Sequence, residues 1–172
     1  IVFSHQPTPH INDWPLADVS IVDVESGRVR ALAATKAAES DPHFSPDGKF
    51  VAFDQSNDPP TWRRRSRVAV VPVAGGAPRL LAETPDAQPN LLGWTKDGRI
   101  VFGETHRTVN RVGVLPADGK APTFVSPEGV MVDNPSLNAT GTHVGFSSQA
   151  PDRAPEPFLA PLARFVHVQA AR

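Results

Sequence analysis

Two kinds of short hairpin alternate along this chain, and their regular repetition is the feature that most limits how the chain can fold. In the first kind, two strand-like segments flank a turn that contains glycine. Its three copies occupy residues 17–33, 67–82 and 111–125. Alternating segments of this length around glycine turns predict β-hairpins. The turn glycines Gly27, Gly76 and Gly119 are 49 and 43 residues apart. A period of this size indicates a repeat architecture.

The second kind of hairpin has a sharper signature at its turn. Its copies occupy residues 41–53, 90–102 and 134–146. In the first copy Pro46 presets the backbone for a turn, Asp47 tolerates the next position, and Gly48 suits a left-handed backbone. The equivalent turn residues of the other copies are Asp97, Gly98 and Gly141. The glycines of this turn are 50 and 43 residues apart, so both hairpins advance with one common period.

Four short strands per repeat of 40 to 50 residues predict an all-β fold and, within that class, a β-propeller. We expect residues 1–172 to be a single fragment of such a domain. The expected blades span about 17–54, 67–104 and 111–148, and residues 1–4 and 156–172 are expected to be parts of the flanking blades. A solenoid of stacked strands is the rival, but its units are shorter. An open arc of three blades would leave exposed edges through which copies could self-associate.

Composition limits the classes of partner. The formal net charge of −1 gives no global field that would attract nucleic acid or an anionic membrane, so neither is expected as a partner. No apolar run is long enough to span a bilayer. The chain has no cysteine, which excludes a disulfide framework but fits a bacterial cytoplasm or periplasm equally well. Frequent Ala, Pro and Arg with no Cys or Tyr suggests a bacterial source.

The segment 44–53, which reads FSPDGKFVAF, resembles the repeat signature of WD40-like propellers in TolB-type proteins and in the prolyl oligopeptidase family of serine peptidases. Residues 10–19, before the first complete hairpin, are similar to the dipeptidyl-aminopeptidase and acylaminoacyl-peptidase-like members of that family. Residues 84–89 with Gly93 and Trp94, and residues 137–138 followed by 141–143, are similar to them as well. The resemblance covers nearly the whole chain.

The resemblance implies that the propeller sits over an α/β-hydrolase domain and restricts its substrates to short or unfolded peptides. The chain itself has no Gly-x-Ser-x-Gly nucleophile elbow; the nearest text, at 145–149, lacks the second glycine. We therefore expect no catalytic residue here and assign any activity to a longer parent protein. The expected role is to gate and orient peptide substrates for a hydrolase domain absent from this chain. The alternative is a stand-alone TolB-like propeller that acts as a protein-binding platform.

Three consecutive arginines are the candidate contact residues. Arg63, Arg64 and Arg65 follow Trp62, and such a cluster could bind phosphate or stack on bases. A solvated connecting loop is the simpler interpretation at this net charge. The family resemblance adds a third: these arginines contact a peptide carboxylate or acidic residues of the hydrolase domain. No cofactor is expected, and the histidines lack the spacing of a metal site.

Overall fold

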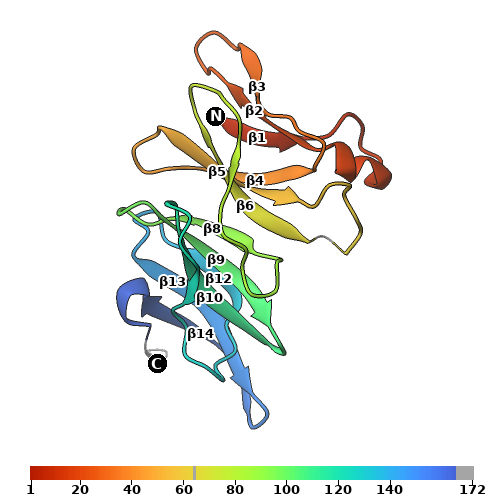
Figure 1. Ribbon diagram of the computed structural model, residues 1–172. Helices are drawn as coiled ribbons and strands as arrows, with labels where there is room; N and C mark the ends of the chain where they lie inside the picture. Colours follow the sequence, from red (N-terminus) through yellow and green to blue (C-terminus); the bar gives the residue numbers. More distant parts are fainter. Residues whose placement is uncertain (64, 166–172) are drawn as a thin grey trace.

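The computed structural model describes residues 1–63 and 65–165, and about half of these residues lie in antiparallel β-strands (Figure 1). The strands form four separate open sheets. The first sheet has the order β1 (Val2–His5), β2 (Asp18–Val22) and β3 (Val29–Ala33), and the second has the order β4 (Glu39–Phe44), β5 (Phe50–Ser56), β6 (Ser66–Pro72) and β7 (Arg79–Leu80). The prediction of an all-β partial propeller is confirmed.

The second half of the chain repeats this arrangement. The third sheet consists of β8 (Asn90–Trp94), β9 (Arg99–His106), β10 (Val109–Pro116) and β11 (Thr123–Phe124), and the fourth of β12 (Asp133–Leu137), β13 (His143–Ala150) and β14 (Arg153–Pro161). Two short 3-10 helices, η1 (Ile11–Leu16) and η2 (Leu162–Arg164), complete the described structure. In the described ranges no helix is long and apolar enough to cross a membrane.

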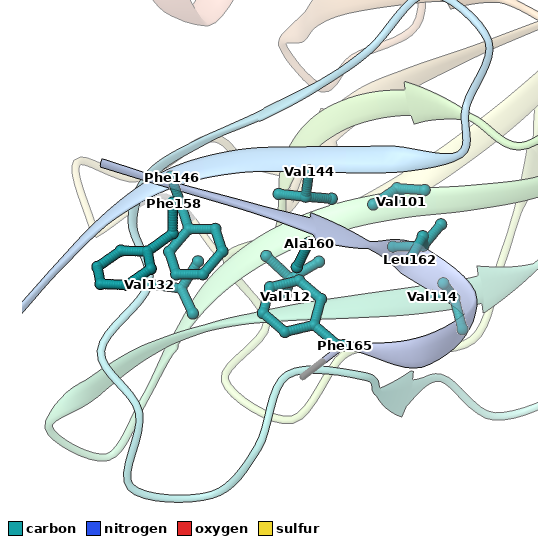
Figure 2. Packing of buried hydrophobic residues seen from close by; sticks show 10 residues of the cluster. All are labelled: Val101, Val112, Val114, Val132, Val144, Phe146, Phe158, Ala160, Leu162 and Phe165. Carbon is teal, nitrogen blue, oxygen red and sulfur yellow. The ribbon is translucent and has the colours of Figure 1, made fainter. Parts of the chain in front are cut away.

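The sheets follow one another side by side, with their first strands adjacent. β4 lies beside β1 of the preceding sheet and beside β8 of the following one, and β8 lies beside β12. Each pair of neighbouring sheets encloses its own apolar cluster. Between the third and fourth sheets Phe146 stacks on Phe158 and Phe165, with ring centroids 5.6 and 5.3 Å apart (Figure 2). The core is therefore divided among the junctions between sheets.

β6 explains why the central strands are apolar on both faces. Val68 and Val70 pack in the cluster with the third sheet, whereas Ala69 and Val71 pack in the cluster with the first. Successive side chains of a strand point to opposite faces, so a sheet with neighbours on both sides needs apolar residues at every position. This is why the sequence shows unbroken apolar runs in place of strict alternation.

The sheets group the hairpins differently from the expected blade limits. The expected blade 17–54 is divided, because β2 and β3 belong to the first sheet while β4 and β5 pair with β6 in the second. The expected blades 67–104 and 111–148 are divided in the same way. The sheets are offset from the expected blades by one hairpin, because either neighbour of a hairpin can complete a four-stranded sheet. Of the expected partial blades, residues 1–4 belong largely to β1 and residues 156–161 to β14, while 166–172 lie outside the described residues.

Candidate functional site

Alternate connections of the strands gather at opposite ends of the sheets. We call one end the turn rim; it contains the connections 23–28, 45–49, 73–78, 95–98, 117–122 and 138–142. We call the other the long-loop rim; it contains the connections 6–17, 34–38, 57–65, 81–89, 107–108, 125–132 and 151–152. The expected turn residues all lie on the turn rim.

Three turns of the turn rim share one backbone hydrogen bond. The amide of Gly48 donates to the carbonyl of Ser45 at 2.9 Å, and the side chain of Ser45 donates to Asp47 at 2.6 Å. Gly98 and Gly141 make the same backbone bond in their own turns, and all three glycines have a positive φ. Pro46 precedes Asp47 in the first of these turns. These residues close hairpins, and their polar groups are largely engaged in doing so.

Two long connections distinguish the first two sheets on the long-loop rim. The equivalent connections in the third and fourth sheets are the tight turns 107–108 and 151–152. The connections 6–17, which contains η1, and 57–65 are much longer and lie side by side (Figure 1). They meet through Trp14 and Trp62, whose ring centroids are 5.5 Å apart. Trp62 is 66% exposed and Ile11 is 75% exposed. We call these residues, with the exposed Leu16, the tryptophan patch.

The three candidate arginines lie next to this patch, as far as the structure describes them. Arg63 and Arg65 are exposed in the 57–65 loop, and Arg64 lies outside the described residues. The carbonyl of Arg63 accepts a hydrogen bond from Gln88 at 2.9 Å, and Arg65 forms an ion pair with Glu83. Both side chains line an open hollow of about 700 Å³, together with residues 83–88 of the 81–89 connection. Among the described residues Arg63 has no ion-pair partner within 4.0 Å.

One polar cross-strand pair recurs in each sheet, just below the long-loop rim. The directly opposite residues are His5 and Asp18, Gln55 and Arg67, Glu104 and Arg111, and Ser148 and Glu156. The two arginines of this set have the same local role. Arg67 donates to the carbonyl of Leu81, and Arg111 donates to that of Ser126 at 2.6 Å while lying 4.3 Å from the centre of the Phe124 ring. They fasten the last strand of a sheet to the strand before it.

Glu104 is buried beside this pairing. It is 4% exposed, and its Oε1 accepts hydrogen bonds from the hydroxyl of Thr84 at 2.5 Å and from the amide of Gln88 at 3.1 Å. Its Oε2 and the Nε of Arg111 are buried without a recorded partner in the described part of the chain. A buried polar group without a partner costs about 1–3 kcal/mol, more when charged. The two free atoms belong to residues that share the wall of one cavity.

Glu39 is a second buried glutamate, at the junction of the first two sheets. It is fully buried, and its Oε1 accepts hydrogen bonds from the hydroxyl of Thr35 at 2.5 Å and from the amide of Thr35 at 3.1 Å. Removal from water raises the pKa of Glu39, the bonds from Thr35 oppose that rise, and the neighbouring Asp18 carboxyl adds to it. In the polar cross-strand pair of the first sheet, Asp18 occupies the position that Arg67 and Arg111 hold in the second and third sheets. The first sheet therefore has an acidic residue at this position, where the next two sheets have a basic one.

The serines nearest to an elbow-like sequence and the metal-ligating side chains were placed as follows. Ser147 and Ser148 lie inside β13 and face cross-strand partners, and residues 1–63 and 65–165 contain no cluster of three or more metal-ligating side chains. Sequence reasoning missed the tryptophan patch and the two buried glutamates. Glu104 could have been noticed as a charged residue at the end of an apolar strand. The contact between Trp14 and Trp62 has no local sequence pattern that indicates it, because it joins two separate loops.

Comparison with known proteins agrees with this architecture. No family model matches the chain. It is 29% identical over 120 residues to tricorn protease homolog 1 of Streptomyces coelicolor, which is 67% of this chain and 11% of that protein. It is 32% identical over 94 residues to dipeptidyl-peptidase 5 of Trichophyton equinum, which is 53% of this chain and 13% of that protein. The chain thus spans a small part of these relatives.

Solved structures share its fold. A puromycin-hydrolyzing peptidase of Mycobacterium tuberculosis superposes with a TM-score of 0.70 at 16% identity, over 99% of this chain and 27% of that one. A protein described as putative TolB from Agrobacterium tumefaciens gives a TM-score of 0.50 at 15% identity, over 95% of this chain and 68% of that one. The sequence relatives are peptidases, and the fold is that of peptidase and TolB propellers. The chain therefore resembles the propeller portions of these peptidases in sequence and in fold.

Proposed function

We propose that this chain gates and orients peptide substrates for an α/β-hydrolase domain of a longer serine peptidase, and that its long-loop rim faces that domain. The observation that supports this best is the tryptophan patch beside Arg63 and Arg65. Exposed aromatic and aliphatic side chains next to arginines are typical of protein interfaces. The patch occurs only where the connections are long, which gives the rim one side suited to contact.

The nature of the parent protein is the first thing to test. The intact mass of the natural gene product and its labelling by a fluorophosphonate probe, which reacts with activated serines, address it directly. We expect a protein of several hundred residues that labels. A short product that does not label would overturn the proposal and favour the alternative, a TolB-like platform that binds other proteins through one rim.

The interface itself is tested by charge and by apolar contact. In the full-length parent, the triple change R63A/R64A/R65A is expected to reduce peptide turnover or weaken the association of the two domains, since acidic groups across the interface lose their partners. Trp62→Ala is expected to weaken the association separately. Val24→Ala, which trims an exposed apolar side chain on the turn rim, serves as the control. Unchanged turnover and unchanged association in both rim variants would remove this role for the long-loop rim.

A further inference from the structure

A pocket of about 550 Å³ opens on the turn rim between the second and third sheets. The hairpin turns 45–49 and 95–98, Arg79 of β7 and Ala117 of a later connection contribute to its wall. It lies at the opposite end of the strands from the tryptophan patch and from the hollow beside Arg63 and Arg65. Its volume is in the range of small-molecule sites in proteins.

The interior of this pocket is apolar. Val70 lies in the apolar cluster between the two sheets, and Trp94 packs against that cluster. Pro46 and the ring of Phe50, which is 41% exposed, add to the same lining. The indole Nε1 of Trp94 donates to the carbonyl of His43 at 3.0 Å, which holds its ring against β4. A ligand of this pocket therefore needs an apolar group to replace the water there.

The pocket is open because the turn of the third sheet stands clear of the second sheet. A Cβ atom added to Gly98 would meet nothing within 4 Å. One added to Gly141, the equivalent glycine of the fourth sheet, would lie 2.8 Å from Cα of Thr95. Phe50 also stands where the third sheet has Arg99, as the strand registers show. The next junction thus has neither the clearance nor the aromatic ring at these two positions.

Each acidic side chain in the wall has a positive charge close to it. Asp97 forms an ion pair with Nε of Arg99 at 2.9 Å. Asp47 accepts hydrogen bonds from the hydroxyl of Ser45 and from the amide of Lys49, and these bonds, with a smaller contribution from the charge of Lys49, lower its pKa. The negative charges of both carboxylates are therefore offset within their own turns.

The two basic side chains in the wall have no such partner. Arg79 and Lys96 are exposed, and among the described residues neither has an ion-pair partner within 4.0 Å. Arg79 uses one terminal nitrogen on the carbonyl of Ala117 at 2.5 Å. Ammonium and guanidinium groups bind carboxylates by charge-assisted hydrogen bonds. An apolar interior with two uncompensated positive charges in its wall suits an apolar molecule that carries an anion.

We propose that this pocket binds a small molecule in which an aliphatic or aromatic body carries a carboxylate. The body lies against Phe50 and Trp94, and the carboxylate accepts hydrogen bonds from Lys96 and Arg79. The site involves neither the long-loop rim nor a hydrolase domain, so it stands or falls separately from the proposed function.

The test uses matched ligands on the unaltered chain, so it does not depend on how a variant folds. Phenylbutyrate, phenylbutyramide, phenylbutylamine and acetate are titrated, and binding is followed by the NMR shifts of the Trp94 indole N–H and the Gly98 amide. We expect phenylbutyrate to bind and the amide to bind about threefold to fivefold more weakly, the value of a partly exposed charge pair. The amine should bind more weakly still, and acetate, which has no apolar body, should not bind measurably. Octanoate is titrated as well, and the tighter of octanoate and phenylbutyrate shows whether the preferred body is aliphatic or aromatic.

A matched pair of variants assigns the binding to Lys96. Lys96→Gln is expected to weaken phenylbutyrate binding about threefold to fivefold and to leave phenylbutyramide binding unchanged, since only the charged ligand loses a partner. Lys36→Gln, the same change at an exposed lysine of the long-loop rim, should leave both affinities unchanged. Equal binding of phenylbutyrate and its amide, no binding of either, or a phenylbutyrate affinity that Lys96→Gln does not change would overturn the proposal. Shifts confined to the indoles of Trp14 and Trp62 would overturn it too, because the tryptophan patch would then be the site.

Discussion

Gly113 of β10 lies directly opposite Phe102 of β9, and a Cβ atom added to Gly113 would overlap the phenyl ring, with Cε1 only 2.7 Å away. Phe102 is fully buried in the cluster between the second and third sheets. The ring therefore uses the space that any other residue at 113 would need. The equivalent pair in the second sheet is Phe53 and Ala69, where the backbone leaves room for a methyl group.

The first prediction follows from this contact. Gly113→Ala is expected to lower the free energy of unfolding by about 1–3 kcal/mol, the usual cost of overpacking a filled core. Chemical denaturation of the variant and the parent chain measures it. Ala69→Gly is the matched control at the equivalent position, where loss of a methyl group and greater chain entropy should cost about 1 kcal/mol. A Gly113→Ala variant as stable as the parent would show that the ring can move aside.

The turn glycines separate backbone strain from steric overlap. Gly48 and Gly141 have φ values of 69° and 66°, but a Cβ atom on Gly48 would meet nothing within 4 Å. One on Gly141 would overlap the carbonyl of Trp94 and lie 2.8 Å from Cα of Thr95. Gly48→Ala should therefore cost only the left-handed backbone, about 1–2 kcal/mol. Gly141→Ala should cost at least about 1 kcal/mol more, because the turn of the fourth sheet is pressed against the third. Equal losses of thermal stability would contradict this contact.

Two arginines link successive sheets on the turn rim. Arg30 donates to the carbonyl of Val73, and Arg79 donates to that of Ala117 at 2.5 Å, each reaching from the last strand of one sheet to the hairpin turn of the next. Arg79→Ala is expected to lower the free energy of unfolding by about 0.5–1.5 kcal/mol, the net value of a hydrogen bond. Arg28→Ala, at an exposed arginine whose side chain bonds to no other residue in the described ranges, should change the free energy of unfolding little. Equal effects of the two substitutions would exclude a specific link.

Glu39 gives a dependence on pH with a definite sign. Burial raises its pKa above the ordinary 4.5, so the folded chain holds a proton that the unfolded chain has already released. The contribution of Glu39 to stability therefore falls as pH rises from about 4.5 through the higher folded-state pKa. The Glu39→Gln variant has no carboxyl group to ionise at this position. The free energy of unfolding of the variant should therefore rise relative to that of the parent chain between about pH 4 and pH 7. Urea denaturation at several pH values measures this difference in free energy, and Glu128→Gln provides the control. A difference that does not vary with pH would contradict a raised pKa of Glu39.

The hairpins could be predicted from sequence because their turns are local. Pro46, Asp47 and Gly48 restrict the backbone by their own conformational preferences, so they predict the turn without information from the rest of the chain. The grouping of hairpins into sheets could not be predicted in the same way. The sequence contained one indication of this grouping. Few residues lie between Glu104 and Arg111, so a tight turn at 107–108 can join the two strands that carry them. Arg107 adopts a φ of 58° in that turn without being glycine, so the usual signal of a hairpin is missing.

The offset between the expected blades and the observed sheets also separated Glu104 from Arg111. The expected blades placed Glu104 at the end of one and Arg111 at the start of the next, whereas the two residues lie directly opposite on paired strands. The candidate arginines were found because three like charges in a row are visible in sequence. Trp14 and Trp62 were not linked, since 47 residues separate them and only the packing of two loops brings them together.

The alternation of β6 has a consequence for how a disturbance spreads through the molecule. Val70 and Val71 are adjacent in sequence but belong to different clusters, one shared with the third sheet and the other with the first. A substitution at either residue first perturbs one junction and reaches the other through the backbone of a single strand. The energetics should thus resemble a row of nearest-neighbour couplings, in which distant junctions respond independently. Change in the loops of one sheet can then accumulate without loosening the sheets beyond its immediate neighbours.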